Sequence, residues 1–166
     1  MSQNYDRQDT ILRVLGMGVE IRAIAAQHGL DPTLVAAVVA QESAGHALAE
    51  RFEPQYRWLW GDDDSEKPFR KPALISKETE FNAQKTSRGP MQIMVATARW
   101  LGFADWPGKL FEPACGLAWG CKYLRWCLDR HEGNTVLGLL RYNGGARPEY
   151  AKEVLAWQRD FQEAMN

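Results

Sequence analysis

The sequence of 166 residues has few cysteines, and their spacing excludes the usual cysteine sites. The three cysteines, Cys115, Cys121 and Cys127, are six residues apart on what is expected to be one helix. Because six residues rotate a helix by about 600°, the thiols do not face one another, and neither a disulfide nor a metal cluster is expected. We interpret them as small buried side chains of a protein that suits a reducing compartment.

An excess of one charge and long apolar runs are also missing. The 20 lysines and arginines nearly balance the 21 aspartates and glutamates, and the net charge of -1 argues against binding a polyanion such as nucleic acid. No apolar run approaches the roughly 18 residues of a membrane span. The polar start MSQNYDRQDT lacks the apolar core of a signal peptide. We therefore expect no integral membrane segment and no signal peptide.

What the chain does have is helical periodicity with capping residues. Helices are predicted at about residues 9–16, 18–29, 31–43, 94–102, 112–133, 134–143 and 147–165. Between residues 44 and 88 the periodicity fails, and this acidic, proline-containing stretch is predicted to be a long loop that is functional or mobile. No strand-rich region or repeat is visible. The prediction is one mainly α domain over residues 1–166, with its core at about 18–160.

One glutamate stands on an apolar helix face, in the stretch VVAQESAGH. Leu34, Val38 and Glu42 are four residues apart, so the carboxyl group projects from the core-forming face. Glu42 also falls in the last turn, where the helix dipole disfavours a negative charge. Desolvation and the dipole both raise its pKa, and an acid that keeps its proton near neutral pH can protonate a leaving-group oxygen. Alternatively, the helix frays here and Glu42 is a solvated end residue.

The stretch SRGPMQIM places a glycine and a proline before Met91 and Gln92, at the expected entry to a helix. Such a turn can aim the glutamine amide at a ligand. Because an amide both donates and accepts hydrogen bonds, it matches an acetamido group.

The stretch RYNGG ends a predicted helix with Tyr142 and Asn143, before two glycines that let a ligand approach the backbone closely. Tyr150 is expected one turn into the last helix. Taken singly, each stretch is a weak signal, because a turn, a helix cap and a core tyrosine explain them better. Their order and combination make the stronger signal.

In that order, the four stretches resemble the motifs of the lysozyme-like soluble lytic transglycosylases, the SLT family. The family usually has E-S-x-F or E-S-x-G, then G-L-M-Q, A-Y-N-A-G and Y-V, and the matching stretches here are residues 42–45, 89–92 and 141–145, and Tyr150 with Val154. The resemblance covers roughly residues 18–160. It implies a lysozyme-like fold and the lytic cleavage of peptidoglycan glycan strands.

The mechanism that this resemblance implies needs one carboxyl group. Protonated Glu42 gives its proton to the oxygen of the β-1,4 bond between N-acetylmuramic acid and N-acetylglucosamine. As a carboxylate it then takes the proton of the muramyl C6 hydroxyl, which attacks C1 and leaves a 1,6-anhydro end. No metal or organic cofactor is implied, and His28, His46 and His131 stand in no metal-binding spacing.

The resemblance also implies roles for the other motif residues. Ser43 and Gln92 would hold the acetamido or lactyl groups, and Met91 would form an apolar floor. Asn143, next to Tyr142 in the substrate site, would bind sugar or backbone. Tyr150 would orient Glu42 by a hydrogen bond. The partner is then the glycan strand itself, and a monomer is favoured.

Two departures from the family pattern concern substrate preference rather than chemistry. Pro90 stands where leucine is common, and Arg141 stands where alanine usually precedes Tyr-Asn. The short chain with its expanded loop looks like a bacteriophage-borne form. It would be a lysis enzyme or a virion component that is made in the bacterial cytoplasm and acts on the cell wall.

The nearest alternative is a muramidase or chitinase-like hydrolase on the same scaffold, which requires a second carboxylate. That group lies about 5–5.5 Å from the acid in retaining enzymes and about 6.5–9.5 Å in inverting ones. The loop offers Glu50, Glu53, Glu78 and Glu80. It also holds Trp58 and Trp60, which are candidates for stacking on saccharide rings.

Two alternatives come from other classes of protein. Residues 21–39 read like a helix-turn-helix, but the second helix has no lysine or arginine and begins with an aspartate. Because phosphate contacts dominate DNA affinity, nucleic-acid binding is disfavoured. A protein that binds the cell wall without cleaving it also remains open.

Overall fold

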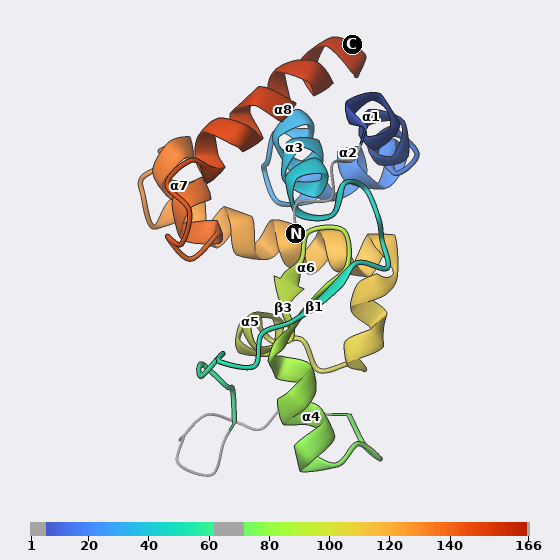
Figure 1. Cartoon of the computed structure of the whole chain (residues 1–166), viewed down its shortest axis with the longest axis vertical. Coiled ribbons are helices and arrows are strands. Elements are labelled where there is room, and N and C mark those ends of the chain that lie inside the picture. Colours follow the sequence, from blue (N-terminus) through green and yellow to red (C-terminus); the bar gives the residue numbers. More distant parts are fainter. Residues whose placement is uncertain (1–5, 62–71, 166) are drawn as a thin grey trace.

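The computed structural model describes residues 6–61 and 72–165, which are mainly helical, as predicted (Figure 1). The helices are α1 (Arg7–Leu15), α2 (Gly18–Gln27), α3 (Pro32–Ser43), α4 (Lys77–Gln84), α5 (Val95–Leu101), α6 (Pro113–Asp129), α7 (Thr135–Tyr142) and α8 (Tyr150–Ala164), with a 3-10 helix, η1, at Pro107–Phe111. Three short strands, β1 (Glu50–Phe52), β2 (Thr86–Arg88) and β3 (Ile93–Met94), form an antiparallel sheet in the order β1-β2-β3.

Helix α6 crosses the middle of the molecule, as Figure 1 shows. Helices α1, α2, α3 and α8 lie on one side of it, and the sheet, α4 and α5 lie on the other. The larger apolar core is formed by α2, α3, α6, α7 and α8, and a smaller one lies between α5, α6 and η1. Cys121 and Cys127 are buried in the larger core as free thiols, as predicted, and Cys115 is partly buried.

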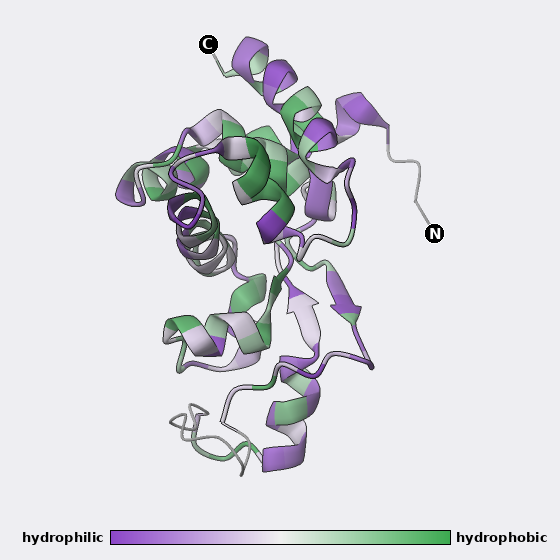
Figure 2. Ribbon diagram, turned by 90° about the vertical axis from the view of Figure 1, so that its left-hand side faces the viewer, coloured by the Kyte–Doolittle hydropathy of each residue, from purple (hydrophilic) through white to green (hydrophobic). Residues whose placement is uncertain are grey.

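Helix α3 is the central element of the larger core, and its sequence sets both of its ends. The Asp31 carboxylate accepts a hydrogen bond from the Thr33 backbone N–H at 2.8 Å, which caps the start as predicted. The backbone turns left-handed at Ala44 (φ 51°) and Gly45 (φ 80°), which ends the helix directly after Ser43. The helices at the centre of the larger core are mostly apolar, whereas outer segments carry hydrophilic residues (Figure 2).

The burial of α3 argues against the helix-turn-helix alternative. The chain bends by 120° between α2 and α3, as such motifs do. However, all seven residues from Leu34 to Ala40 are buried, and α3 packs along α8. A recognition helix must leave one face free for the DNA groove, and α3 has no such face. Among the described residues, no single helix is long and apolar enough to cross a membrane.

The stretch predicted as a long loop is more regular than expected. It contains β1, α4 and β2, where a structureless connection was predicted for residues 44–88. Strands of two or three residues are too short to show an alternating pattern, which explains why the sequence did not reveal the sheet. The sheet separates two surfaces: Arg51 and Ser87 are register partners on one face, and Phe52 and Thr86 are partners on the other.

Candidate active site

A cavity of about 1040 Å³ lies between the end of α3, the sheet and the end of α7. It is lined by Glu42, Arg51, Glu53, Gln55, Tyr56, Arg57, Trp58, Ser87, Gln92, Ile93, Met94, Thr97, Tyr123, Tyr142, Asn143, Gly144 and Ala146. Ligand cavities in proteins usually hold about 300–1,000 Å³, so this one has room for more than a single sugar.

Glu42 is the acid of this cavity. It lies in the last turn of α3 and is only partly exposed, because the apolar face of the helix is buried on both sides of it. Burial raises the pKa of Glu42 from 4.5 to about 7, against the opposing effects of a hydrogen bond from Tyr150 and the charges of Arg51 and Arg147. A carboxyl group with this pKa can hold its proton near neutral pH and release it when a leaving oxygen demands it.

Tyr150 contacts the acid directly. Its hydroxyl donates a hydrogen bond of 2.5 Å to Oε1 of Glu42. Burial and the nearby Glu42 charge raise the pKa of Tyr150 well above 10, so the phenol stays a donor. Because Oε1 accepts this bond, the acidic proton of Glu42 belongs on Oε2. Tyr150 is the first residue of α8, because this helix begins about one turn later than the sequence predicted.

Tyr142 and Asn143 line the cavity at the end of α7, as predicted. The Tyr142 hydroxyl donates to the backbone carbonyl of Met91 at 2.8 Å, so it ties α7 to the turn before β3. The side-chain oxygen of Asn143 is buried and has no hydrogen-bond partner in the described part of the chain. Buried polar atoms are nearly always satisfied, so this oxygen is an acceptor available to a ligand.

Three residues predicted for the substrate site lie outside the cavity lining: Tyr150, which contacts Glu42, and also Ser43 and Met91. Ser43 is buried, and its hydroxyl faces the backbone carbonyls of Val39 at 3.1 Å and Pro90 at 2.8 Å. Met91, predicted as an apolar floor, is fully buried in the larger core against Gly120 and Cys121. Ser43 and Met91 therefore support the site from behind, and Met94 of β3 provides the thioether in the cavity.

Gln92 lines the cavity, but its amide is occupied. The side-chain nitrogen donates to the backbone carbonyls of Ala49 at 2.8 Å and Gly89 at 3.0 Å, and the oxygen accepts from the Ser87 hydroxyl at 3.0 Å. The stretch 89–92 is the turn between β2 and β3 rather than the entry to a helix. Gln92 therefore fastens this turn to the segment before β1, which the sequence motif did not indicate.

The four loop glutamates proposed as a second carboxylate have different surroundings. Glu80 is fully buried and paired with Arg99, Glu50 is paired with Arg88, and Glu78 lies in the first turn of α4. Only Glu53 lines the cavity, where it forms a 2.5 Å ion pair with Arg51. No group of three potential metal ligands occurs among the residues that the structure describes.

Several residues of the cavity wall belong to none of the four sequence motifs. Arg51 lies on β1, beside the acid, and Tyr56, Thr97 and Tyr123 come from three different segments. Tyr56 and Thr97 are hydrogen-bonded to each other. Only Arg51 had a sequence signal, as a cation within the irregular stretch that follows Glu42. The others meet only after the sheet has folded against α5 and α6.

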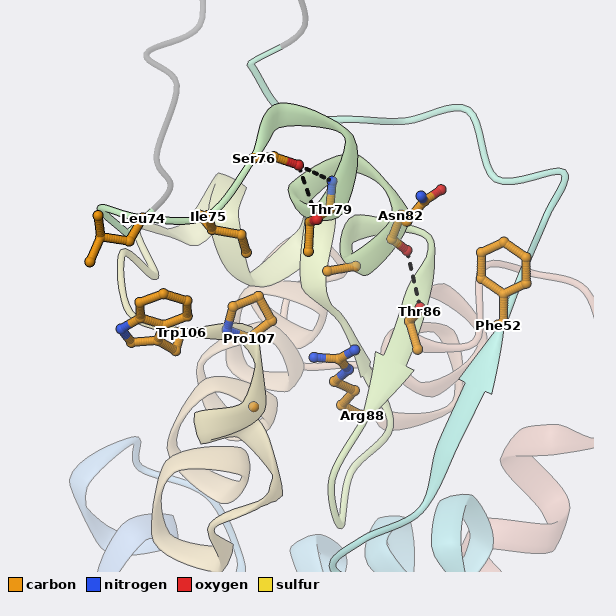
Figure 3. A pocket seen from close by; sticks show the side chains of 12 residues that line it. Phe52, Leu74, Ile75, Ser76, Thr79, Asn82, Thr86, Arg88, Trp106 and Pro107 are labelled. Carbon is orange, nitrogen blue, oxygen red and sulfur yellow. Dashed lines mark hydrogen bonds between the residues drawn. The ribbon is translucent and has the colours of Figure 1, made fainter.

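A second cavity of about 790 Å³ lies on the opposite face of the sheet (Figure 3). Phe52, Trp106 and Pro107 line it together with Arg88, which pairs with Glu50. The described residues of its lining include no aspartate, glutamate, histidine or cysteine. The carboxyl group with the raised pKa, that of Glu42, lies in the other cavity.

Two comparisons with known proteins agree with this geometry. The family model described as the transglycosylase SLT domain matches residues 20–163, in line with the resemblance seen in the motifs. The chain is also similar to the X-ray structure of an inactive mutant of the lytic transglycosylase Slt from Pseudomonas aeruginosa, with a TM-score of 0.61 and 19% identity. That likeness covers 89% of this chain but 24% of the other, so this chain spans about a quarter of its length. It confirms the predicted fold.

Proposed function

We propose a function for this chain from the premise that it belongs to the transglycosylase SLT domain family. The protein is a lytic transglycosylase that cleaves the β-1,4 bond between N-acetylmuramic acid and N-acetylglucosamine in peptidoglycan. Glu42 acts first as general acid and then as general base. The observation that carries this proposal is a carboxyl group with a pKa of about 7 in a large cavity, where a tyrosine hydroxyl holds it in place.

In the first step, Glu42 donates the proton on Oε2 to the glycosidic oxygen as the C1–O bond breaks. Positive charge then develops at C1 and the ring oxygen, as in other glycosidase reactions. Glu42 becomes a carboxylate, and Tyr150, Arg51 and Arg147 all favour this charged form. The surroundings therefore stabilise both protonation states of Glu42. Burial favours the neutral acid, and these three groups favour the carboxylate.

In the second step, the muramyl C6 hydroxyl attacks C1 and gives its proton to Glu42. A C1–O6 bond replaces the broken one, so the product has a 1,6-anhydro end and no water is added. This step needs one carboxyl group that works twice. A pKa near the working pH suits that double role, because neither protonation state is strongly disfavoured.

Two further observations support a glycan as the substrate. The unpartnered oxygen of Asn143 is an acceptor for a sugar hydroxyl or amide N–H. The aromatic ring of Tyr123 in the cavity wall presents an apolar surface of the kind that covers a sugar face. The similar Slt structure was obtained from an inactive mutant in which glutamine replaces a glutamate, and we propose the same substitution at Glu42.

The test is the digestion of purified sacculi, with mass analysis of the released muropeptides. Wild-type protein is expected to release 1,6-anhydro products, and Glu42→Gln is expected to fold normally while its rate falls by at least about 10³-fold. Products heavier by one water would instead establish a hydrolase. Retained turnover in Glu42→Gln would remove the mechanism.

Glu53→Gln separates the two reaction types further. As a hydrolase the enzyme would depend on Glu53, which is the only one of the four loop glutamates in the cavity lining. As a transglycosylase it keeps most of its rate in this variant, and its products keep their mass. A collapse of activity in Glu53→Gln comparable to that in Glu42→Gln would favour the hydrolase.

We also propose that the enzyme is carried by a bacteriophage, acts on the cell wall from a cytoplasmic pool or a virion, and works as a monomer. These points rest on the sequence alone. Sedimentation of the purified protein tests the last of them, and a dimer at micromolar concentration would contradict it.

A further inference from the structure

Trp58 is a solvent-exposed residue in the lining of the cavity that contains Glu42. Its side chain is 81% exposed, compared with 46% for Trp106 and 37% for Trp100. Single exposed apolar side chains are common on protein surfaces and by themselves mean little. Trp58 differs from an ordinary exposed side chain, because hydrogen bonds anchor the backbone on both sides of it.

The segment that carries Trp58 is anchored along its length. The Glu53 backbone N–H donates to the carbonyl of Lys85 at 2.8 Å, and the Tyr56 hydroxyl is hydrogen-bonded to Thr97 of α5. On the other side, the buried amide of Gln84 binds Trp60 twice. It accepts from the Trp60 N–H at 2.6 Å and donates to the Trp60 carbonyl at 2.9 Å.

A buried ionic cluster in turn fixes Gln84. Its amide nitrogen also donates to Glu80 at 3.0 Å, and Arg99 grips both oxygens of Glu80 at 2.7 and 3.0 Å. Both charged side chains are fully buried, and Arg99 also donates to the backbone carbonyls of Phe103 and Asp105. Such a cluster is weak evidence for stability, since apolar residues often replace a buried pair at no cost. Here it fixes the backbone two residues from an exposed indole.

Trp58 and the acid approach the cavity from opposite parts of the molecule. Helix α3 ends above α6 in Figure 1, and the teal segment after β1 lies below it, beside α5. Both line the same cavity of about 1040 Å³. A ligand that contacts both must reach across this cavity, as a glycan strand can.

We propose that Trp58 is a distal sugar-binding subsite, which rests on the proposed function and names the part of the substrate that this end of the cavity binds. β-1,4-linked N-acetylhexosamines carry their ring substituents in the equatorial plane, so C–H groups are exposed on the two ring faces. These faces pack on an indole, which loses water on contact. Because the backbone that carries the indole is already anchored on both sides, binding requires little further ordering of the main chain. The subsite therefore selects for long strands over short fragments.

The experiment measures how affinity depends on strand length in the catalytically inactive Glu42→Gln protein. The probes are β-1,4-linked N-acetylglucosamine oligomers from dimer to hexamer, titrated by calorimetry. We expect the hexamer to bind more tightly than the dimer, and Trp58→Ala in this background to weaken the hexamer about tenfold, equal to about 1.4 kcal/mol. Dimer affinity should not change. Trp58→Phe should keep part of the hexamer affinity, because it retains a ring.

Trp106→Ala is the matched control, since it removes an exposed tryptophan from the other cavity. It should leave both affinities unchanged. The indole N–H resonance of Trp58, assigned by its loss in Trp58→Phe, should move on addition of hexamer. Equal hexamer affinity with and without Trp58, or no dependence on length in the Glu42→Gln protein, overturns the subsite. Neither result bears on the proposed reaction. That reaction is tested separately, by whether wild-type protein releases anhydro products from sacculi.

Discussion

The hydroxyl of Tyr150 donates a 2.5 Å hydrogen bond to Glu42, although 108 positions separate the two residues. Glu42 lies at the end of α3 and Tyr150 at the start of α8, and these helices pack along one another in the larger core. Burial of the apolar faces therefore brings the acid and its partner together. The same burial raises the pKa of Glu42, and the hydrogen bond moderates the rise.

Tyr150→Phe should move the pH dependence of activity upward. The hydroxyl favours the charged form of Glu42, so its loss raises the pKa of the acid further. A change of one pKa unit corresponds to about 1.4 kcal/mol, the size of one hydrogen bond to a charged group. We therefore expect the alkaline limb of kcat/KM to shift up by about one pH unit, and the maximal rate to fall roughly tenfold because Glu42 is less stable as the base.

The measurement is the pH–rate profile on soluble glycan strands, for this variant and wild type. Tyr142→Phe is a useful comparison, because the Tyr142 hydroxyl donates to the backbone at Met91 and not to the acid. Its alkaline limb should stay close to that of wild type. An unchanged or lower limb in Tyr150→Phe would show that the bond does not control the acid.

Glu42 should destabilise the folded protein as the pH rises. Its folded pKa of about 7 exceeds the ordinary value of 4.5, so the folded state binds more protons than the unfolded state between these values. The free energy of unfolding therefore falls as the pH rises through this window, by about 3 kcal/mol in total, and the loss is complete above it.

Glu42→Gln removes this dependence, because an amide does not titrate. The stability of the variant relative to wild type should increase between about pH 4.5 and pH 7, and reach a difference of about 10 °C in Tm at the alkaline end. Thermal unfolding of both proteins across this range tests the prediction. A constant difference in Tm would mean that Glu42 titrates like a solvated carboxyl group.

Local signals in the sequence were sufficient for most helices and for the partly buried position of Glu42. Asp31 and Asn134 cap helices as predicted, and the face shared by Val38 and Glu42 is buried as its spacing requires. These features depend on neighbours within one or two turns, so a single stretch of sequence contains them. The prediction that Tyr150 orients Glu42 is matched by the observed hydrogen bond, but it came from a family resemblance and not from spacing.

The predictions that the structure contradicts depend on contacts between distant segments. The motif around Met91 and Gln92 identified the right stretch, but not which side chain would face the cavity. Met91 points into the larger core because Gly120 leaves room for it, and Gln92 holds Ala49, 43 residues away. Nothing within a four-residue turn indicates either partner. Ser43 likewise binds the carbonyl of Pro90, on a turn that only the sheet brings close.

Gly89 is the position in the motif where the backbone conformation and a close neighbour together exclude any residue with a Cβ atom. It has a φ of 79°, and a Cβ added there would lie 2.1 Å from the Leu110 carbonyl oxygen, which is backbone and cannot rotate away. Gly89→Ala must therefore move η1 or open the turn that carries Gln92. We expect the free energy of unfolding to fall by roughly 3 kcal/mol or more, through steric overlap and left-handed strain together.

Gly108→Ala is the matched control, because Gly108 lies in the same η1 segment and nothing stands within 4 Å of an added Cβ. It should change the free energy of unfolding by no more than about 1 kcal/mol, in either direction. Urea denaturation of both variants measures the contrast. Gly89→Ala should also reduce the lytic rate at temperatures where it stays folded. The displaced turn contains Gln92 and leads directly into Met94 of β3, and both residues line the cavity of Glu42. If its stability matched that of Gly108→Ala, the close approach of Gly89 to Leu110 would not exist in solution, and the motif glycine would need a different explanation.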